Sequence, residues 1–281
     1  MDGADVRLDA IDSQTGDVKF ELTVPASRQQ LVNLRRRGTE SVCSPGTASP
    51  KVEIGVVNND GFAYLAFSQK DQTLSTGACR PGSVVEPREV TVSYSDRMVL
   101  WQIRPDGTHR DTVFEETAGT HSLAQPLPAA TPAGAIIPDG LGGVLLAVRR
   151  SENVFGGKTP RLPKELVDRL DGEGKLAYKL SLPEFEGPLH DEMVLGEKNL
   201  GFATRGGTLI AFDVELGKEL WRWQSSSPEI EAFAALADGS CLVQTESALV
   251  AVTDSTNSKV VAEGRGMLDW QGRLYIQHKQ P

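Results

Sequence analysis

The chain is short of basic residues, of cysteines and of long apolar runs, and these shortages exclude several classes of protein. Lys and Arg together number 29 against 38 Asp and Glu, which gives a formal net charge of −9 at pH 7. A net acidic chain is poorly suited to binding nucleic acid or an anionic membrane surface. No apolar run approaches the roughly 20 residues that a membrane-spanning helix needs. We therefore expect no nucleic-acid partner and no transmembrane segment.

Motifs for catalysis and cofactor binding are also missing. The four histidines include no pair at the i, i+2 or i, i+4 spacing of a metal site. The sequence has neither a G-x-S-x-G elbow nor a phosphate-binding G-x-x-x-x-G-K-[ST] loop. The run from Asp9 to Asp17 is similar to a calcium loop but has no Glu at its twelfth position. We predict no cofactor, no metal ion and no catalytic residue.

What the sequence does contain is a repeat. Its clearest copy, TLIAFDVELGKELWRW at 208–223, includes Gly217 in the middle of two β-prone runs. Degraded copies place Gly16 and Asn257 at the position of Gly217. Glycine and asparagine tolerate positive φ, so we expect this position to close a tight turn between two strands. Self-similarity at a period of about 40 residues is typical of propellers and solenoids.

A second set of turns lies between the first ones, as in ADGSCLVQTES at 237–247. Each is a Gly or Asn turn followed by an apolar, β-prone run, which predicts a hairpin. The repeat therefore consists of four antiparallel strands, A to D. In the second half of the chain we expect these strands near 191–196, 200–204, 208–213 and 218–224, and again near 230–236, 240–245, 248–253 and 259–263.

The two ends of the chain each hold half a repeat. Residues 6–11 and 17–24 have the pattern of C and D strands, and 267–270 and 273–278 that of A and B strands. We predict an all-β, single-domain β-propeller over residues 1–281, with about five four-stranded antiparallel blades. The N-terminal C/D strands are expected to pair with the C-terminal A/B strands, which closes the ring and hides its sheet edges. A sixth, degenerate blade in 25–50 or 69–95 is the alternative.

The best copy of the repeat, A-F-D-x-x-x-G-K-E-L-W, resembles the tryptophan-docking repeat of PQQ-like β-propellers. The four residues that carry this resemblance are Ala211, Asp213, Gly217 and Trp221. In the other copies the tryptophan is replaced by Phe20, Tyr178 or Val261. The resemblance implies a propeller in which Trp221 packs between blades. Quinoprotein dehydrogenases of this architecture hold their cofactor with calcium and have an adjacent-cysteine disulfide. No adjacent cysteines occur here, so the resemblance implies no PQQ site.

The three cysteines have different expected roles. Cys43 and Cys79 flank one predicted hairpin, in loops rich in Pro and Gly, so we predict a disulfide between them. The alternative is two unrelated thiols. A disulfide indicates an oxidising compartment. Cys241 lies in an alternating strand and is expected in the core.

Insertions into the regular repeat lie near 25–50, 69–90 and 149–165, and 117–135 is expected to be an extended connector. Long loops on a rigid scaffold commonly carry binding sites. The first insertion contains a run of three basic residues, Arg35, Arg36 and Arg37. This run is a candidate anion-binding patch, and the alternative is a solvated loop.

From these features we predict a non-catalytic binding or scaffold propeller that acts as a monomer outside the cytoplasm. The expected location is the periplasm or the extracellular face of a bacterial envelope, with any leader or anchor outside this sequence. Its partner is a protein, a peptide or a saccharide, held by rim loops or by the central funnel. One alternative is a carbohydrate-active enzyme with a carboxylate pair in the funnel. A quinoprotein-like dehydrogenase is the less favoured alternative.

Overall fold

The protein is all-β. The structure, a computed structural model, describes residues 5–29, 35–37, 40–42, 46–48, 52–54, 62–74, 84–85, 91–122, 127–153, 164–182, 193–268 and 274–277. Throughout these ranges the regular elements are β-strands, and they contain no helix long and apolar enough to cross a membrane. The prediction of an all-β chain is confirmed.

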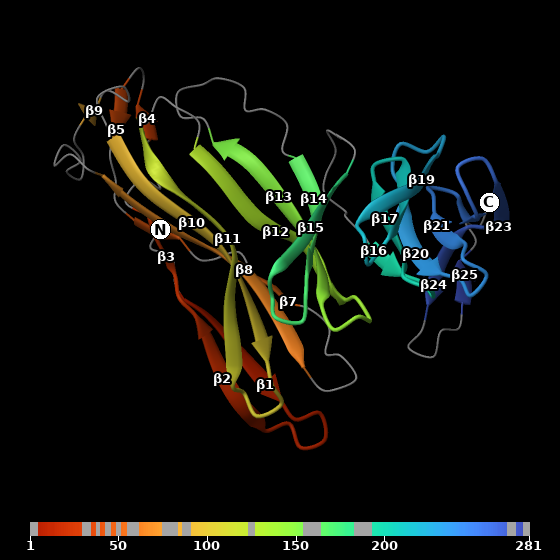
Figure 1. The fold of residues 1–281 in the computed structure, drawn as a ribbon, viewed down its shortest axis with the longest axis horizontal. Helices are drawn as coiled ribbons and strands as arrows, with labels where there is room; N and C mark the ends of the chain where they lie inside the picture. The colour runs from red at the N-terminus through yellow and green to blue at the C-terminus, as the bar shows by residue number, and fades with distance from the viewer. Residues whose placement is uncertain are drawn as a thin grey trace. The chain divides into compact units, whose positions relative to one another are not determined.

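Three sheets contain four strands each, arranged in chain order (Figure 1). The first consists of β12 (Leu127–Pro138), β13 (Val144–Asn153), β14 (Lys164–Leu170) and β15 (Leu176–Ser181). The second consists of β16 (Met193–Leu195), β17 (Leu200–Arg205), β18 (Thr208–Asp213) and β19 (Lys218–Gln224). The third consists of β20 (Glu231–Ala235), β21 (Cys241–Gln244), β22 (Ala248–Val252) and β23 (Ser258–Glu263). The strands expected in the second half of the chain are confirmed.

A larger sheet comes from the first half of the chain. Its two long central strands, β8 (Ala63–Leu74) and β10 (Thr91–Ile103), pair antiparallel with each other, and β11 (His109–Ser122) pairs with β10. The short strand β7 (Val52–Ile54) pairs with one end of β8. The order β7-β8-β10-β11 thus repeats the four-stranded unit. Near the other end of β8 the sheet continues through β3 (Ser27–Gln29) to β6 (Gly46–Ala48).

Two expectations for the first half need correction. Residues 117–122, expected in a connector, extend β11, because β10 begins at Thr91 and its first residues pair with them up to Ser122. Residues 127–135 belong to β12. The basic run expected in a loop is a short strand, β4 (Arg35–Arg37), which pairs with β5 (Glu40–Val42). β5 in turn pairs with β9 (Val84–Val85).

Hairpins occupy both ends of the chain. β1 (Val6–Ile11) and β2 (Val18–Val24) form one two-stranded sheet. β24 (Arg265–Leu268) and β25 (Leu274–Gln277) form another. These are the half-repeats that the sequence predicts. Their union into a shared blade, and with it the closed ring, stays a prediction.

The chain divides into two compact units. The first comprises Met1–Pro132, Val148–Pro163 and Glu173–Lys175, and the second comprises Ala133–Ala147, Lys164–Gly172 and Leu176–Pro281. Each unit has its own apolar cores. In the first, Trp101 of β10 and Phe67 of β8 pack edge to face, with ring centroids 5.1 Å apart, in a cluster that also includes Leu22 and Val24 of β2.

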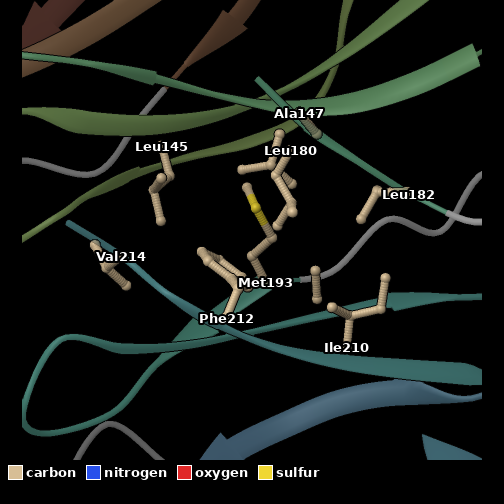
Figure 2. Packing of buried hydrophobic residues seen from close by; sticks show 10 residues of the cluster. Leu145, Ala147, Leu180, Leu182, Met193, Ile210, Phe212 and Val214 are labelled. Carbon is tan, nitrogen blue, oxygen red and sulfur yellow. The ribbon is translucent and has the colours of Figure 1, made fainter. Parts of the chain in front are cut away.

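The described residues of the second unit form two cores, each made by side chains from two consecutive sheets. In the first of these, Met193 reaches from β16 toward Leu180 and Ala147, and Phe212 of β18 lies beside it (Figure 2). The next core joins sheet β16–β19 to sheet β20–β23 and contains Phe202. Phe202 and Phe212 are fully buried, and burying a side chain of this size contributes about 1.5–3 kcal/mol. Consecutive sheets are therefore held together by apolar faces.

Candidate functional site

At two turn glycines, an aromatic side chain from the last strand of an earlier sheet packs against the glycine. A β-carbon placed on Gly217, in the β18–β19 turn, would lie 2.4 Å from the ring of Tyr178 on β15. The same relationship recurs in the first unit, where a β-carbon on Gly107 would lie 2.7 Å from the ring of Phe20 on β2. Both glycines have positive φ, 65° and 86°. Glycine is thus required twice over at each site, by the backbone conformation and by the packed ring.

Other copies of this turn differ. Gly174 also has positive φ, and its neighbour is Thr112 of β11 in place of an aromatic ring. Gly16 has a φ of 79°, with no atom of the described residues within 4 Å of the site where a β-carbon would lie. Asn257 has no positive φ, contrary to the expectation from its alignment with Gly217. Its turn is one residue shorter, because Val252 pairs with Ser258 where Phe212 pairs with Glu219. The amide of Thr253 donates to the carbonyl of Asn257, so Asn257 lies opposite Thr253 and not in the position of Gly217.

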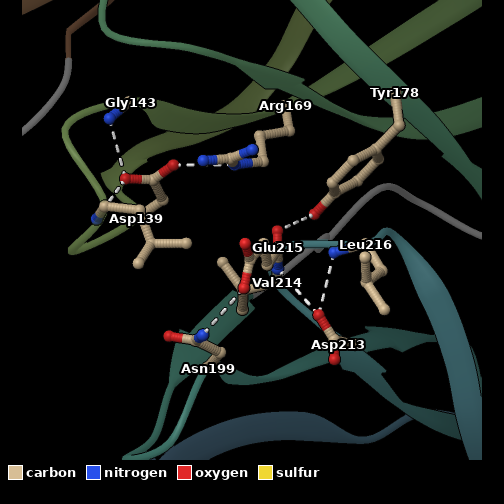
Figure 3. Close-up of polar contacts among 10 residues, drawn as sticks. Asp139, Gly143, Arg169, Tyr178, Asn199, Asp213, Val214, Glu215 and Leu216 are labelled. Carbon is tan, nitrogen blue, oxygen red and sulfur yellow. Dashed lines mark hydrogen bonds and ion pairs between the residues drawn. The ribbon is translucent and has the colours of Figure 1, made fainter.

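A buried ion pair lies near the Tyr178–Gly217 contact in the second unit (Figure 3). Asp139 has a fully buried side chain and accepts a hydrogen bond of 2.8 Å from Nε of Arg169, which is 13% exposed. Its other oxygen accepts hydrogen bonds from the backbone amides of Leu141 and Gly143. The Asp139 carboxylate therefore joins the β12–β13 turn to strand β14.

Tyr178 makes a second contact with the β18–β19 turn. Its hydroxyl donates a 2.8 Å hydrogen bond to the carbonyl of Val214 (Figure 3). Burial is the main cause that raises the pKa of Tyr178, and the Arg169 guanidinium opposes it. The phenol therefore stays protonated and serves as a donor, because a tyrosinate could not donate this bond.

The remaining polar groups of the β18–β19 turn are bonded locally. Asp213 accepts hydrogen bonds from the amides of Glu215 and Leu216, which is the usual cap of a tight turn. The side chain of Asn199 donates to Glu215 at 3.4 Å. Asp139, Arg169, Tyr178 and Asp213 are thus all bonded to other groups of the protein. Their bonds stabilise the turns that they join.

A groove in the same unit has a different character. It has a volume of about 490 Å³. It is lined by Trp223, by the turn that follows Trp223, and by residues of strands β22 and β23. The turn supplies Ser225, Ser226, Ser227 and Pro228. The lining also includes Ser247, Ser258 and Glu246. Its volume is within the range of small-ligand sites, about 300–1,000 Å³.

Some of the polar groups that line the groove have no partner in the protein, whereas Ser225, Ser227 and Thr245 have one. In the described part of the chain, no protein partner is bonded to the side chains of Ser226, Ser247, Ser258 and Glu246, or to the indole N–H of Trp223. By contrast, the hydroxyl of Ser227 donates to the carbonyl of Glu229. These five uncommitted polar groups make the groove the candidate functional site.

The residues predicted to form a disulfide, Cys43 and Cys79, lie outside the described residues. Arg35, Arg36 and Arg37 occupy β4, opposite Val42, Ser41 and Glu40 of β5 in the register of the two strands. Their anion-binding role stays a prediction.

The repeat positions occupy structural places. Ala211 is fully buried, and Trp221 packs against the core between sheets β16–β19 and β20–β23 with its ring 5.9 Å from that of Phe202. Cys241 is fully buried, as expected, and burial raises the pKa of its thiol to about 12. Among the described residues, no group of three or more His, Cys, Asp or Glu is placed to hold a metal ion.

Sequence reasoning missed both the ion pair and the groove. The PDG turn at 138–140 predicts a hairpin, but nothing near it indicates that Arg169 is the partner of Asp139. The serine run at 225–227 after Trp223 was the available signal for the groove. No protein-family model matches the chain, and no curated protein matches its sequence.

Proposed function

We propose that this chain is a non-catalytic binding or scaffold domain of β-propeller type that works outside the cytoplasm. One contrast carries the proposal. The polar groups around Asp139 and Tyr178 are bonded to the protein itself, whereas Glu246, three serines and the indole N–H of Trp223 in the groove have no partner among the described residues. Polar side chains that the protein leaves unpaired are suited to holding a ligand, while a catalytic site needs groups with matched pKa values near a reacting atom.

The propeller part of the proposal is supported by the repeated contact between sheets. Phe20 lies at Gly107, and Tyr178 lies at Gly217. The last member of this series, after Trp221 on β19, is Val261 on β23, which is 50% exposed. Ring closure would place Val261 against Gly16, whose neighbourhood is open, and would join β25 to β1 in a shared blade.

Closure is tested by spin labels on Arg7 of β1 and Gln277 of β25. Neighbouring strands lie about 5 Å apart, so a closed ring gives one short, narrow distance between the labels. A long or broad distance distribution would overturn the propeller. Val261→Asp is a second test, because a charge against Gly16 should open the ring and lengthen the distance.

Catalysis is tested on the purified chain with a panel of polysaccharides, by assay of newly formed reducing ends. We expect the number of reducing ends to stay at the level of the buffer blank. Release of reducing ends that disappears on replacing one carboxylate would overturn the proposal in favour of a carbohydrate-active enzyme.

Location is tested through Cys43 and Cys79. Mass spectrometry of the alkylated chain, with and without reductant, should show one disulfide between them in protein isolated from its native compartment. Two alkylated thiols before reduction would remove the support for an oxidising compartment.

A further inference from the structure

We propose that the Trp223 groove binds a neutral oligosaccharide, with one sugar ring packed on the Trp223 indole. This inference rests on the proposed binding function and names the class of its ligand. Three observations support the inference. The groove is lined by an aromatic ring together with hydroxyl groups, the one charged residue among its described lining residues is negative, and strand β23 lines it with side chains.

The lining combines one aromatic ring with several hydroxyl groups. Trp223 is partly buried against the core below it, so its ring is held in place while part of it remains accessible. The apolar face of a pyranose ring packs on such an aromatic surface, and an indole also has an N–H to donate. The hydroxyls of Ser226, Ser247 and Ser258 both donate and accept hydrogen bonds, which matches the hydroxyls of a sugar.

The charge of the groove disfavours anionic ligands. Among the described residues that line it, none is Lys or Arg, and the one charged residue is Glu246. A phosphate, a nucleic acid or an acidic glycan would be repelled by this carboxylate and by the net charge of −9. A carboxylate readily accepts hydrogen bonds from the hydroxyls of a neutral sugar.

The orientation of β23 favours a ligand that is recognised by side chains. β23 is the edge strand of its sheet, so its outer backbone groups are available to an added peptide strand. The groove, however, is lined by Ser258 and Val260, which are two residues apart and therefore share one face of β23. A ligand in the groove meets this face and not the backbone edge, which argues for a sugar over a strand-forming peptide.

The test is isothermal titration calorimetry of the purified chain against hexasaccharides of β-1,4-linked glucose, β-1,4-linked N-acetylglucosamine and α-1,4-linked glucose. We expect the wild type to bind at least one of them, with a change in tryptophan fluorescence. Trp223→Ala should weaken binding about ten-fold or more through loss of the stacking surface. Glu246→Gln should weaken it several-fold. Tyr275→Ala, which removes a 49%-exposed aromatic ring that does not line the groove, should leave binding unchanged.

Trp223 also touches the core, so its variant can lose stability for another reason. Ser258→Trp keeps Trp223 and fills the groove from an exposed position, and it should abolish binding while the chain stays folded by circular dichroism. Absence of binding to every hexasaccharide up to millimolar concentration would overturn the proposal, as would binding that both variants retain.

A peptide array probed with the same wild-type chain and with Ser258→Trp distinguishes loss of the saccharide specificity from loss of the binding function. Peptide binding that Ser258→Trp abolishes, without any sugar binding, would overturn the saccharide and leave the binding function standing. Binding of neither class would count against both proposals.

Discussion

The ring of Tyr178 occupies the space that a side chain on Gly217 would need. The nearest ring carbon lies 2.4 Å from the position of a β-carbon there, and the Tyr178 hydroxyl bonds to the carbonyl of Val214 in the same turn. One residue of β15 thus fixes the turn of the next sheet both by packing and by a hydrogen bond. This contact gives the sharpest predictions about stability.

Gly217→Ala should destabilise the protein more than Gly16→Ala. Both glycines have positive φ, 65° and 79°, and a left-handed backbone costs a residue with a β-carbon about 1–2 kcal/mol. Only Gly217 is in contact with a ring, and forcing an extra carbon into a packed site adds about 1–3 kcal/mol. Urea unfolding of the two variants measures the difference. Equal losses would show that the Tyr178 ring moves away without cost.

The same pair can be tested by a double-mutant cycle. In a Tyr178→Ala background the ring is gone, so Gly217→Ala should cost no more than Gly16→Ala does in the wild type. A full cost in that background would mean that the backbone, and not the ring, determines the preference for glycine.

Tyr178→Phe should lower the free energy of unfolding by about 1 kcal/mol, the usual contribution of one hydrogen bond. It should also change the response to alkali. The pKa of Tyr178 is raised above its ordinary value of 10.0, so the folded state holds the phenolic proton more tightly than the unfolded state. Its contribution is complete below pH 10 and is lost as the pH rises further. Unfolding curves from pH 8 to pH 11 should therefore fall less steeply for the variant.

Asp139→Asn should destabilise the protein by about 3–5 kcal/mol, because it leaves Arg169 charged and buried without its partner. The matched control is Glu219→Gln, which breaks the exposed ion pair with Arg222. Exposed pairs contribute about 0–1 kcal/mol. Thermal and urea unfolding of both variants test the contrast. A loss below 1 kcal/mol for Asp139→Asn would mean that water or another group replaces the carboxylate.

Acid should destabilise the fold between about pH 4 and pH 2, the interval that separates the ordinary and the folded pKa values. A hydrogen bond from Lys19 is the main cause that lowers the pKa of Asp12 from 3.8 to about 2, and one from Asn257 does the same for Asp254. Lowered pKa values mean that the unfolded chain binds more protons in this interval, so stability falls as the pH falls. Urea midpoints at successive pH values measure the loss. Asp254→Asn should make the midpoint less dependent on pH between 4 and 2.

The strands of the second half could be predicted from the sequence because their signals are local. Alternating side chains and turn residues at 213–217 and 237–240 act within a few neighbours along the chain. The same reasoning failed at Asn257, because its turn is one residue shorter than that of Gly217 and the two residues are not in equivalent positions. It failed also at 117–122, where a partner strand, and not the local sequence, decides whether the chain is a connector or a strand.

The sequence alone determined the all-β class, the four-stranded repeat and the half-repeats at its ends, since each depends on residues adjacent in the chain. Only the tertiary structure paired Asp139 with Arg169, placed Tyr178 against Gly217 and opened a groove beside Trp223. Those relationships join residues tens of positions apart. They arise where the apolar faces of separate sheets pack together. No local sequence pattern specifies which side chains come into contact there.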